Sequence, residues 1–118
     1  IHAEGFAGGE LKHGPIALIE EGTAVIAILP TADEHQLDEK MLSNIQEVKA
    51  RGARVVVIAA EGVEVLGAEH IIRIPVASPL FQPVLATVPL QVFAYEIAVA
   101  RGTDVDQPRN LAKSVTVE

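Results

Sequence analysis

Two continuous apolar runs dominate the pattern of hydrophobic and polar positions along the chain. Residues 23–29 (TAVIAIL) lie between Gly22 and Pro30, and residues 54–59 (RVVVIA) repeat the pattern about thirty positions later. Short apolar runs bounded by turn residues are typical of strands that are buried on both faces, as in a parallel sheet. We therefore predict two buried parallel strands.

A helix is predicted between these two runs. Its apolar positions recur at helical spacing: Leu37, Met41, Ile45 and Val48. Thr31 and Glu34 have the spacing of a capping box at a helix start, and Gly52 follows the last periodic residue as a stop signal. The polar positions from Glu34 to Glu47 are most simply the solvated face of this helix. The unit is a strand, a crossover helix and a second strand parallel to the first.

The remaining elements are shorter or less regular. Residues 71–74 predict a third strand that ends at Pro75, and residues 61–69 predict at most a poor helix. Residues 80–101 are apolar with helical period, and Pro83 and Pro89 lie in their first half. Because proline is tolerated in the first turn of a helix but kinks its interior, we expect the regular helix to begin near Val88. One face of that helix is expected to hold five side chains: Leu90, Phe93, Ala94, Ile97 and Ala98.

The N-terminal twenty residues predict small elements. Residues 1–8 read as a helix end that Gly8 and Gly9 close. Residues 10–15 form a polar loop, and residues 16–19 could make one helical turn. Together these elements predict an α/β protein, a doubly wound three-layer sandwich with a mostly parallel sheet. Three strands are few for that class, so we expect the first strand of the sheet to be missing.

The composition of the chain disfavours several classes of partner and of chemistry. The chain has 118 residues, 49% of them hydrophobic, a net charge of −7 and no cysteine. That length fits one domain, and the acidic balance disfavours nucleic acid and anionic lipid as partners. No uninterrupted apolar run reaches the ~18 residues of a membrane span. Thiolate chemistry is excluded, and the histidine spacing does not favour a zinc site.

Two side chains are candidates for chemistry. Lys113 lies in a C-terminal segment without helical or strand period. A lysine there is most often a solvated charge, but a desolvated amine could form a Schiff base or transfer a proton. His13 lies in the polar loop, where histidines are more often structural or exposed than catalytic. Its ordinary pKa near ~6.5 suits proton transfer, and Lys12 beside it makes the loop locally positive, as a phosphorylated substrate would require.

Two stretches resemble a known enzyme family. The loop GELKHGPIALIE (residues 9–20) and the ending GTDVDQPRNLAKSVTVE (residues 102–118) resemble the C-terminal part of glutamine–fructose-6-phosphate aminotransferases (isomerizing), also called glucosamine-6-phosphate synthases. The segment VPLQVFAYEIAVARG (residues 88–102) is similar in style, whereas residues 31–78 resemble the family only in pattern. The family has a glutaminase domain and two SIS (sugar isomerase) subdomains.

The resemblance implies a role for particular residues. Lys113 matches the Schiff-base lysine, and His13 matches the histidine that opens the sugar ring and reaches the neighbouring subunit's site. Asn110 and Ala112 fall in the tail that closes over the sugar. Residues 1–102 would be the C-terminal portion of a SIS subdomain, and residues 103–118 that tail. The implied protein is a cytoplasmic homodimer that acts on fructose 6-phosphate without a cofactor.

The resemblance also implies that three functional parts of the family's enzymes are not contained in these 118 residues. They are the glutaminase, the loop that holds the sugar phosphate and the glutamate that moves the proton between C1 and C2. We therefore expect the isolated chain to be inactive, and to self-associate through its open sheet edge. The alternative is a non-catalytic SIS module that binds a sugar phosphate or pairs subunits, although such a module does not need a tail that bears a lysine.

Overall fold

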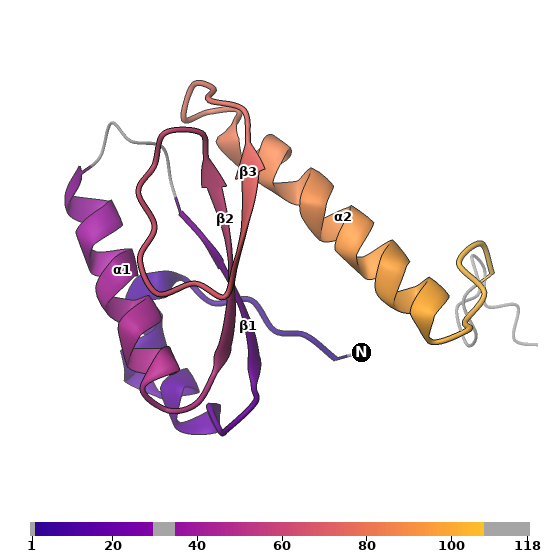
Figure 1. The fold of residues 1–118 in the computed structure, drawn as a ribbon, viewed down its shortest axis with the longest axis horizontal. Helices are drawn as coiled ribbons and strands as arrows, with labels where there is room; N and C mark the ends of the chain where they lie inside the picture. The colour runs from indigo at the N-terminus through magenta and orange to yellow at the C-terminus, as the bar shows by residue number, and fades with distance from the viewer. Residues whose placement is uncertain (1, 30–34, 108–118) are drawn as a thin grey trace, which may run out of the picture. The chain divides into compact units, whose positions relative to one another are not determined.

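Three parallel strands form one sheet in the computed structural model, which describes residues 2–29 and 35–107. The strands β1 (Ala24–Ile28), β2 (Arg54–Ala60) and β3 (His70–Ile74) lie side by side in that order (Figure 1). Val25 pairs with Val55 in the first ladder, and both ladders are parallel. The predicted α/β class with a parallel sheet is confirmed, and so are the three strands.

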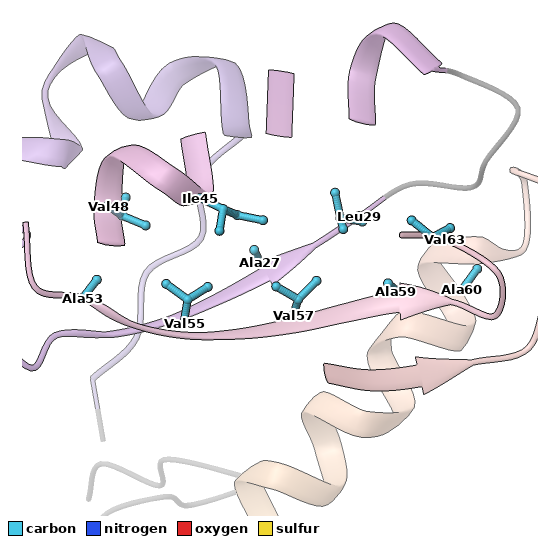
Figure 2. Close-up of a cluster of buried hydrophobic side chains, with 10 residues drawn as sticks. All are labelled: Ala27, Leu29, Ile45, Val48, Ala53, Val55, Val57, Ala59, Ala60 and Val63. Atoms are coloured by element: carbon cyan, nitrogen blue, oxygen red, sulfur yellow. The ribbon is translucent and has the colours of Figure 1, made fainter. Parts of the chain in front are cut away.

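The helix α1 (His35–Lys49) covers one face of the sheet. Its Ile45 and Val48 are only 2% and 1% exposed, and Figure 2 shows them over the strands beside Val55 and Val57. The cluster includes ten buried side chains: Ala27, Leu29, Ile45, Val48, Ala53, Val55, Val57, Ala59, Ala60 and Val63. The helical spacing in the sequence therefore identified the face of α1 that packs on the sheet.

The opposite face of the sheet is also partly buried. Ile58 alternates with the clustered valines along β2 and is 1% exposed, and Ile74 of β3 is 4% exposed. The first turns of the helix α2 (Gln82–Ala100) contain two further buried residues, Gln82 and Ala86. Burial on both faces explains why β2 is continuously apolar from Val55 to Ala60 instead of alternating between apolar and polar residues.

The chain divides into two compact units, and the boundary between them falls inside α2, between Ala86 and Thr87. Most of α2 belongs to the second unit. Of the predicted face, Leu90, Ile97 and Ala98 are half-buried, whereas Phe93 and Ala94 are exposed. By length and composition α2 is long and apolar enough to cross a membrane, which the search for an uninterrupted apolar run did not detect. A long helix that is apolar on all sides is equally typical of a helix buried in a large protein.

Two predictions about the N-terminal half need comment. Residues 2–7 form no helix, and the first helical element begins only at Gly8. Gly5 lies within this segment and disfavours a helix there, because a glycine costs backbone entropy in a helix. The proposed capping pair, Thr31 and Glu34, lies outside the described residues.

Two predictions about the second half were also wrong. The helix α2 begins at Gln82, six residues before the predicted start at Val88, and it includes Pro89. Residues 61–69 form turns instead of a poor helix. The Arg73 guanidinium accounts for part of this, since its Nη1 donates to the carbonyl oxygens of Ala60 (3.0 Å) and Val63 (2.7 Å) and so holds the connection open.

The packing of α1 on the sheet predicts that truncating its buried residue Ile45 strongly destabilises the fold. Ile45→Ala should lower the free energy of unfolding by about 2–5 kcal/mol, because it leaves a cavity against the sheet. Urea unfolding followed by circular dichroism measures this. Ile71→Ala is the matched control, since Ile71 is 40% exposed and should cost about 1 kcal/mol or less. Equal losses for the two variants would contradict the described core.

Candidate functional site

His13 ends the first of two short 3-10 helices. These are η1 (Gly8–His13) and η2 (Pro15–Leu18), and neither contains a fully buried residue. The predicted turn at residues 16–19 is thus confirmed as η2, and the predicted polar loop is a defined 3-10 turn. The His13 side chain is exposed, so its imidazole is free to meet a ligand from outside this chain.

Gly14 separates the two short helices and sets the direction of the chain after His13. Its φ of 150° and ψ of −52° are open only to glycine at low cost. Its carbonyl accepts a hydrogen bond of 2.9 Å from the backbone N–H of Ala17. Because a Cβ at Gly14 would meet nothing within 4 Å, the constraint at this position is the backbone itself.

The helix α1 holds η1 at two points. The Asn44 Nδ2 donates a hydrogen bond of 2.8 Å to the Gly8 carbonyl oxygen. The Lys12 Nζ lies 2.7 Å from the Glu47 Oε1 in an ion pair. Gly8 also lies close to Met41, so that a Cβ at Gly8 would overlap the methionine sulfur.

The role of α1 in holding this loop was not predicted from the sequence. The polar positions up to Glu47 were interpreted as a solvated face, yet Asn44 is buried, with only 6% of its surface exposed. One signal was present: Asn44 and Glu47 directly precede Ile45 and Val48, so they share the spacing of the buried stripe. The locally positive character expected of Lys12 is also reduced, since its ammonium faces a carboxylate.

A second turn follows α2 at residues 103–107. The Thr103 Oγ1 donates to the Ala98 carbonyl at 2.9 Å, after Gly102 ends the helix. The Asp104 carboxylate then accepts the backbone N–H groups of Gln107 (3.0 Å) and Asp106 (2.9 Å). These N–H groups, that of Gln107 first, hold the pKa of Asp104 below its ordinary value.

The other predicted site residues, Asn110, Ala112 and Lys113, lie outside the described residues. Their roles therefore stay predictions, as does any approach of Lys113 to His13. Within residues 2–29 and 35–107, no group of three or more histidines and acidic residues is placed to hold a metal ion. In the part that is described, the site is one exposed imidazole on a loop attached to a packed helix. Such a group can exchange a proton with a ligand that it reaches.

The chain is similar to known proteins in both sequence and structure. A family model described as the SIS domain matches residues 1–101. Over its whole length the chain is 63% identical to the glutamine–fructose-6-phosphate aminotransferase [isomerizing] of Leifsonia xyli subsp. xyli (strain CTCB07), of which it covers 20%. It is 64% identical to the protein of the same name from Corynebacterium diphtheriae, of which it covers 19%.

A solved structure gives the same answer. The C-terminal domain of glucosamine-fructose-6-phosphate aminotransferase from Francisella tularensis superposes with a TM-score of 0.78 at 36% identity, over 91% of this chain and 30% of that one. The resemblance that the two ends of the sequence indicated is thus confirmed. The chain spans about a fifth of the length of the relatives named above.

The backbone at Gly14 predicts a specific sensitivity. Gly14→Ala should lower the free energy of unfolding by about 1–2 kcal/mol, because it forces an L side chain into a conformation that glycine alone adopts readily. Denaturant unfolding together with amide exchange of residues 8–18 measures this.

Gly9→Ala is the matched control for that substitution. Gly9 has open space around it, as Gly14 has, but it is not among the glycines with positive φ. Its replacement should change stability by no more than about 0.5 kcal/mol. If the Gly9 variant were the less stable of the two, the described turn would be incorrect.

Proposed function

This chain belongs to the SIS domain family, and we propose on this basis that it is the C-terminal isomerase portion of a glutamine–fructose-6-phosphate aminotransferase. The observation that supports this best is 60–64% identity over the whole chain to proteins of that name. We further propose that residues 1–102 belong to a SIS subdomain and residues 103–118 to a tail that closes over the sugar. The longer protein would be a cytoplasmic homodimer with a glutaminase domain.

The proposed role of His13 is to open the sugar ring. Fructose 6-phosphate is mostly cyclic, with O5 bonded to C2. The protonated imidazole would deliver a proton to O5 while the C2–O5 bond breaks, and the anomeric hydroxyl would lose its proton to water, which leaves a C2 ketone. The exposure of His13 at the end of η1 supports this role, because the imidazole must reach a ligand outside its own loop.

The proposed role of Lys113 is covalent. A neutral amine would add to the C2 ketone and release water to give an imine, and ammonia from glutamine hydrolysis would then displace the lysine. Transfer of a proton from C1 to C2, together with transfer of the O1 proton to the nitrogen, would give the C1 aldehyde and C2 amine of glucosamine 6-phosphate. Because an ordinary lysine has a pKa near ~10.4, a desolvated setting is needed to supply the neutral amine. Asn110 and Ala112 would contact the sugar beside it.

The exposed surface of α2 supports a larger assembly. Several large apolar side chains are at least half exposed along it, Val84, Val88, Val92, Tyr95 and Val99 among them. A helix apolar on all sides is normally covered in the working protein. The alternative function is a SIS module that binds a sugar phosphate without turnover. Its α2 would also have to be covered by another part of the protein, so only a measurement of catalytic activity distinguishes the two proposals.

Substitutions in the full-length protein separate the two roles. His13→Ala should lower kcat/KM for fructose 6-phosphate by about 10²–10⁴-fold, the range for loss of a general acid or base. It should leave nearly unchanged the rate with 5-deoxyfructose 6-phosphate, which has no O5 with which to close the ring. Lys113→Arg keeps the charge but not a neutral amine, and should abolish turnover of both compounds.

Glucosamine 6-phosphate formed from glutamine and either sugar is the measurement. Borohydride treatment with fructose 6-phosphate should add the reduced sugar to Lys113 of the wild type, as seen by mass spectrometry. A fully active Lys113→Arg variant would overturn the covalent role. A wild type that binds fructose 6-phosphate in calorimetry, yet forms no product, would favour the non-catalytic module.

The proposed dimer predicts complementation between inactive variants. If His13 serves the partner's site, a mixture of full-length His13→Ala and Lys113→Ala subunits should regain roughly a quarter of wild-type activity. Random assortment makes half of the dimers mixed, and each mixed dimer has one complete site of two. Unfolding and refolding the mixture, with each variant alone as control, tests this. No recovery in a mixture shown to contain mixed dimers would contradict the shared site.

A further inference from the structure

The loop that bears His13 cannot fix its own geometry. It consists of η1, six residues in 3-10 conformation, and none of them is buried. Short 3-10 segments have poor hydrogen-bond geometry and are stable only with outside support. A proton-transfer group must nevertheless be held within a narrow range of positions. The support for His13 therefore has to come from another element.

The first attachment is at the start of η1. Asn44 is only 6% exposed, and its Nδ2 donates a hydrogen bond of 2.8 Å to the Gly8 carbonyl oxygen. Asn44 directly precedes Ile45, which packs on the sheet, so this hydrogen bond links η1 to the core. The absence of a side chain at Gly8 lets the backbone approach Met41 closely.

The second attachment is at the residue next to His13. The Lys12 ammonium lies 2.7 Å from the Glu47 carboxylate, with the two side chains 50% and 36% exposed. Glu47 follows Asn44 by three positions on α1, so both residues lie on the same side of the helix. One attachment would allow η1 to pivot, whereas two at opposite ends fix its orientation.

We propose that Asn44 and Glu47 are positioning residues for His13: α1 holds both ends of η1 and thereby sets where the imidazole stands for ring opening. This inference rests on the function proposed above. It assigns Lys12 to the internal support of the loop, through Glu47, rather than to the substrate. Neither α1 residue needs to touch the sugar.

Charge exchange in the full-length enzyme tests the ion pair. Glu47→Lys and Lys12→Glu should each lower kcat/KM for fructose 6-phosphate by about fivefold, the upper end for a partly exposed ion pair. The double variant Lys12→Glu with Glu47→Lys should recover most of the loss. Glu39→Lys, the same charge change at an exposed position of α1, is the control and should have no such effect.

The open-chain compound distinguishes positioning from general damage. The rate with 5-deoxyfructose 6-phosphate should stay at the wild-type level in every variant, because no ring has to be opened. Asn44→Ala should reduce only the fructose 6-phosphate rate, by on the order of tenfold or more, since it leaves the Gly8 carbonyl unpaired. Should this variant fold poorly, the exposed charge exchange still decides the matter.

Three outcomes would overturn the inference. One is equal loss with both compounds, which would indicate a structural role. Another is a double variant no better than the single ones, which would place Lys12 on the substrate. The third is a Glu47→Lys variant whose kcat/KM for fructose 6-phosphate equals that of the wild type. By contrast, a folded wild type that makes no glucosamine 6-phosphate refutes the proposed function itself, and amide exchange of residues 8–13 in Glu47→Lys then still reports whether α1 holds the loop.

Discussion

The packing of α1 on the sheet is the interaction on which the described structure depends. Ile45 and Val48 are almost completely buried over β2, and the crossover between β1 and β2 is thereby fixed. The same helix reaches η1 through Asn44 and Glu47, one position before each of those residues. The hydrophobic stripe that stabilises the fold therefore also sets the position of the loop with His13. A change in the core next to these two residues would act at a distance on the proposed chemistry.

The fold could be predicted where one strong physical term decides the conformation. Continuous apolar runs and helical spacing located the three strands and α1, because burial of aliphatic side chains is the dominant stabilising term there. The failures occurred where weaker terms compete. Gly5 disfavours a helix before Gly8. Arg73 holds the connection after β2 by hydrogen bonds that no periodicity reveals. The start of α2 was misplaced because Pro89 was given more weight than the apolar helix around it.

The sequence suggested which residue to consider as a site, but it did not predict which contacts hold that residue in place. The resemblance singled out His13 from a short loop motif, and the structure shows it exposed at the end of η1. Nothing in that motif indicates what holds the loop, because the partners lie more than thirty residues away on α1. Long-range polar contacts of this kind depend on the relative placement of elements, which local patterns do not contain. Lys113 lies outside the described residues, so its part rests on the resemblance and on the experiments proposed for it.

The use of Lys12 bears on how an acidic chain would accept an anionic sugar phosphate. At a net charge of −7, the chain needs a local excess of cations wherever a phosphate is to bind. Lys12 was the obvious candidate near His13, but its ammonium is engaged by Glu47 at 2.7 Å. Phosphate bound there would have to compete with a carboxylate already in contact. Under the proposed function, it follows that the phosphate is recognised elsewhere in the longer protein, and that this loop acts on the ring end of the sugar.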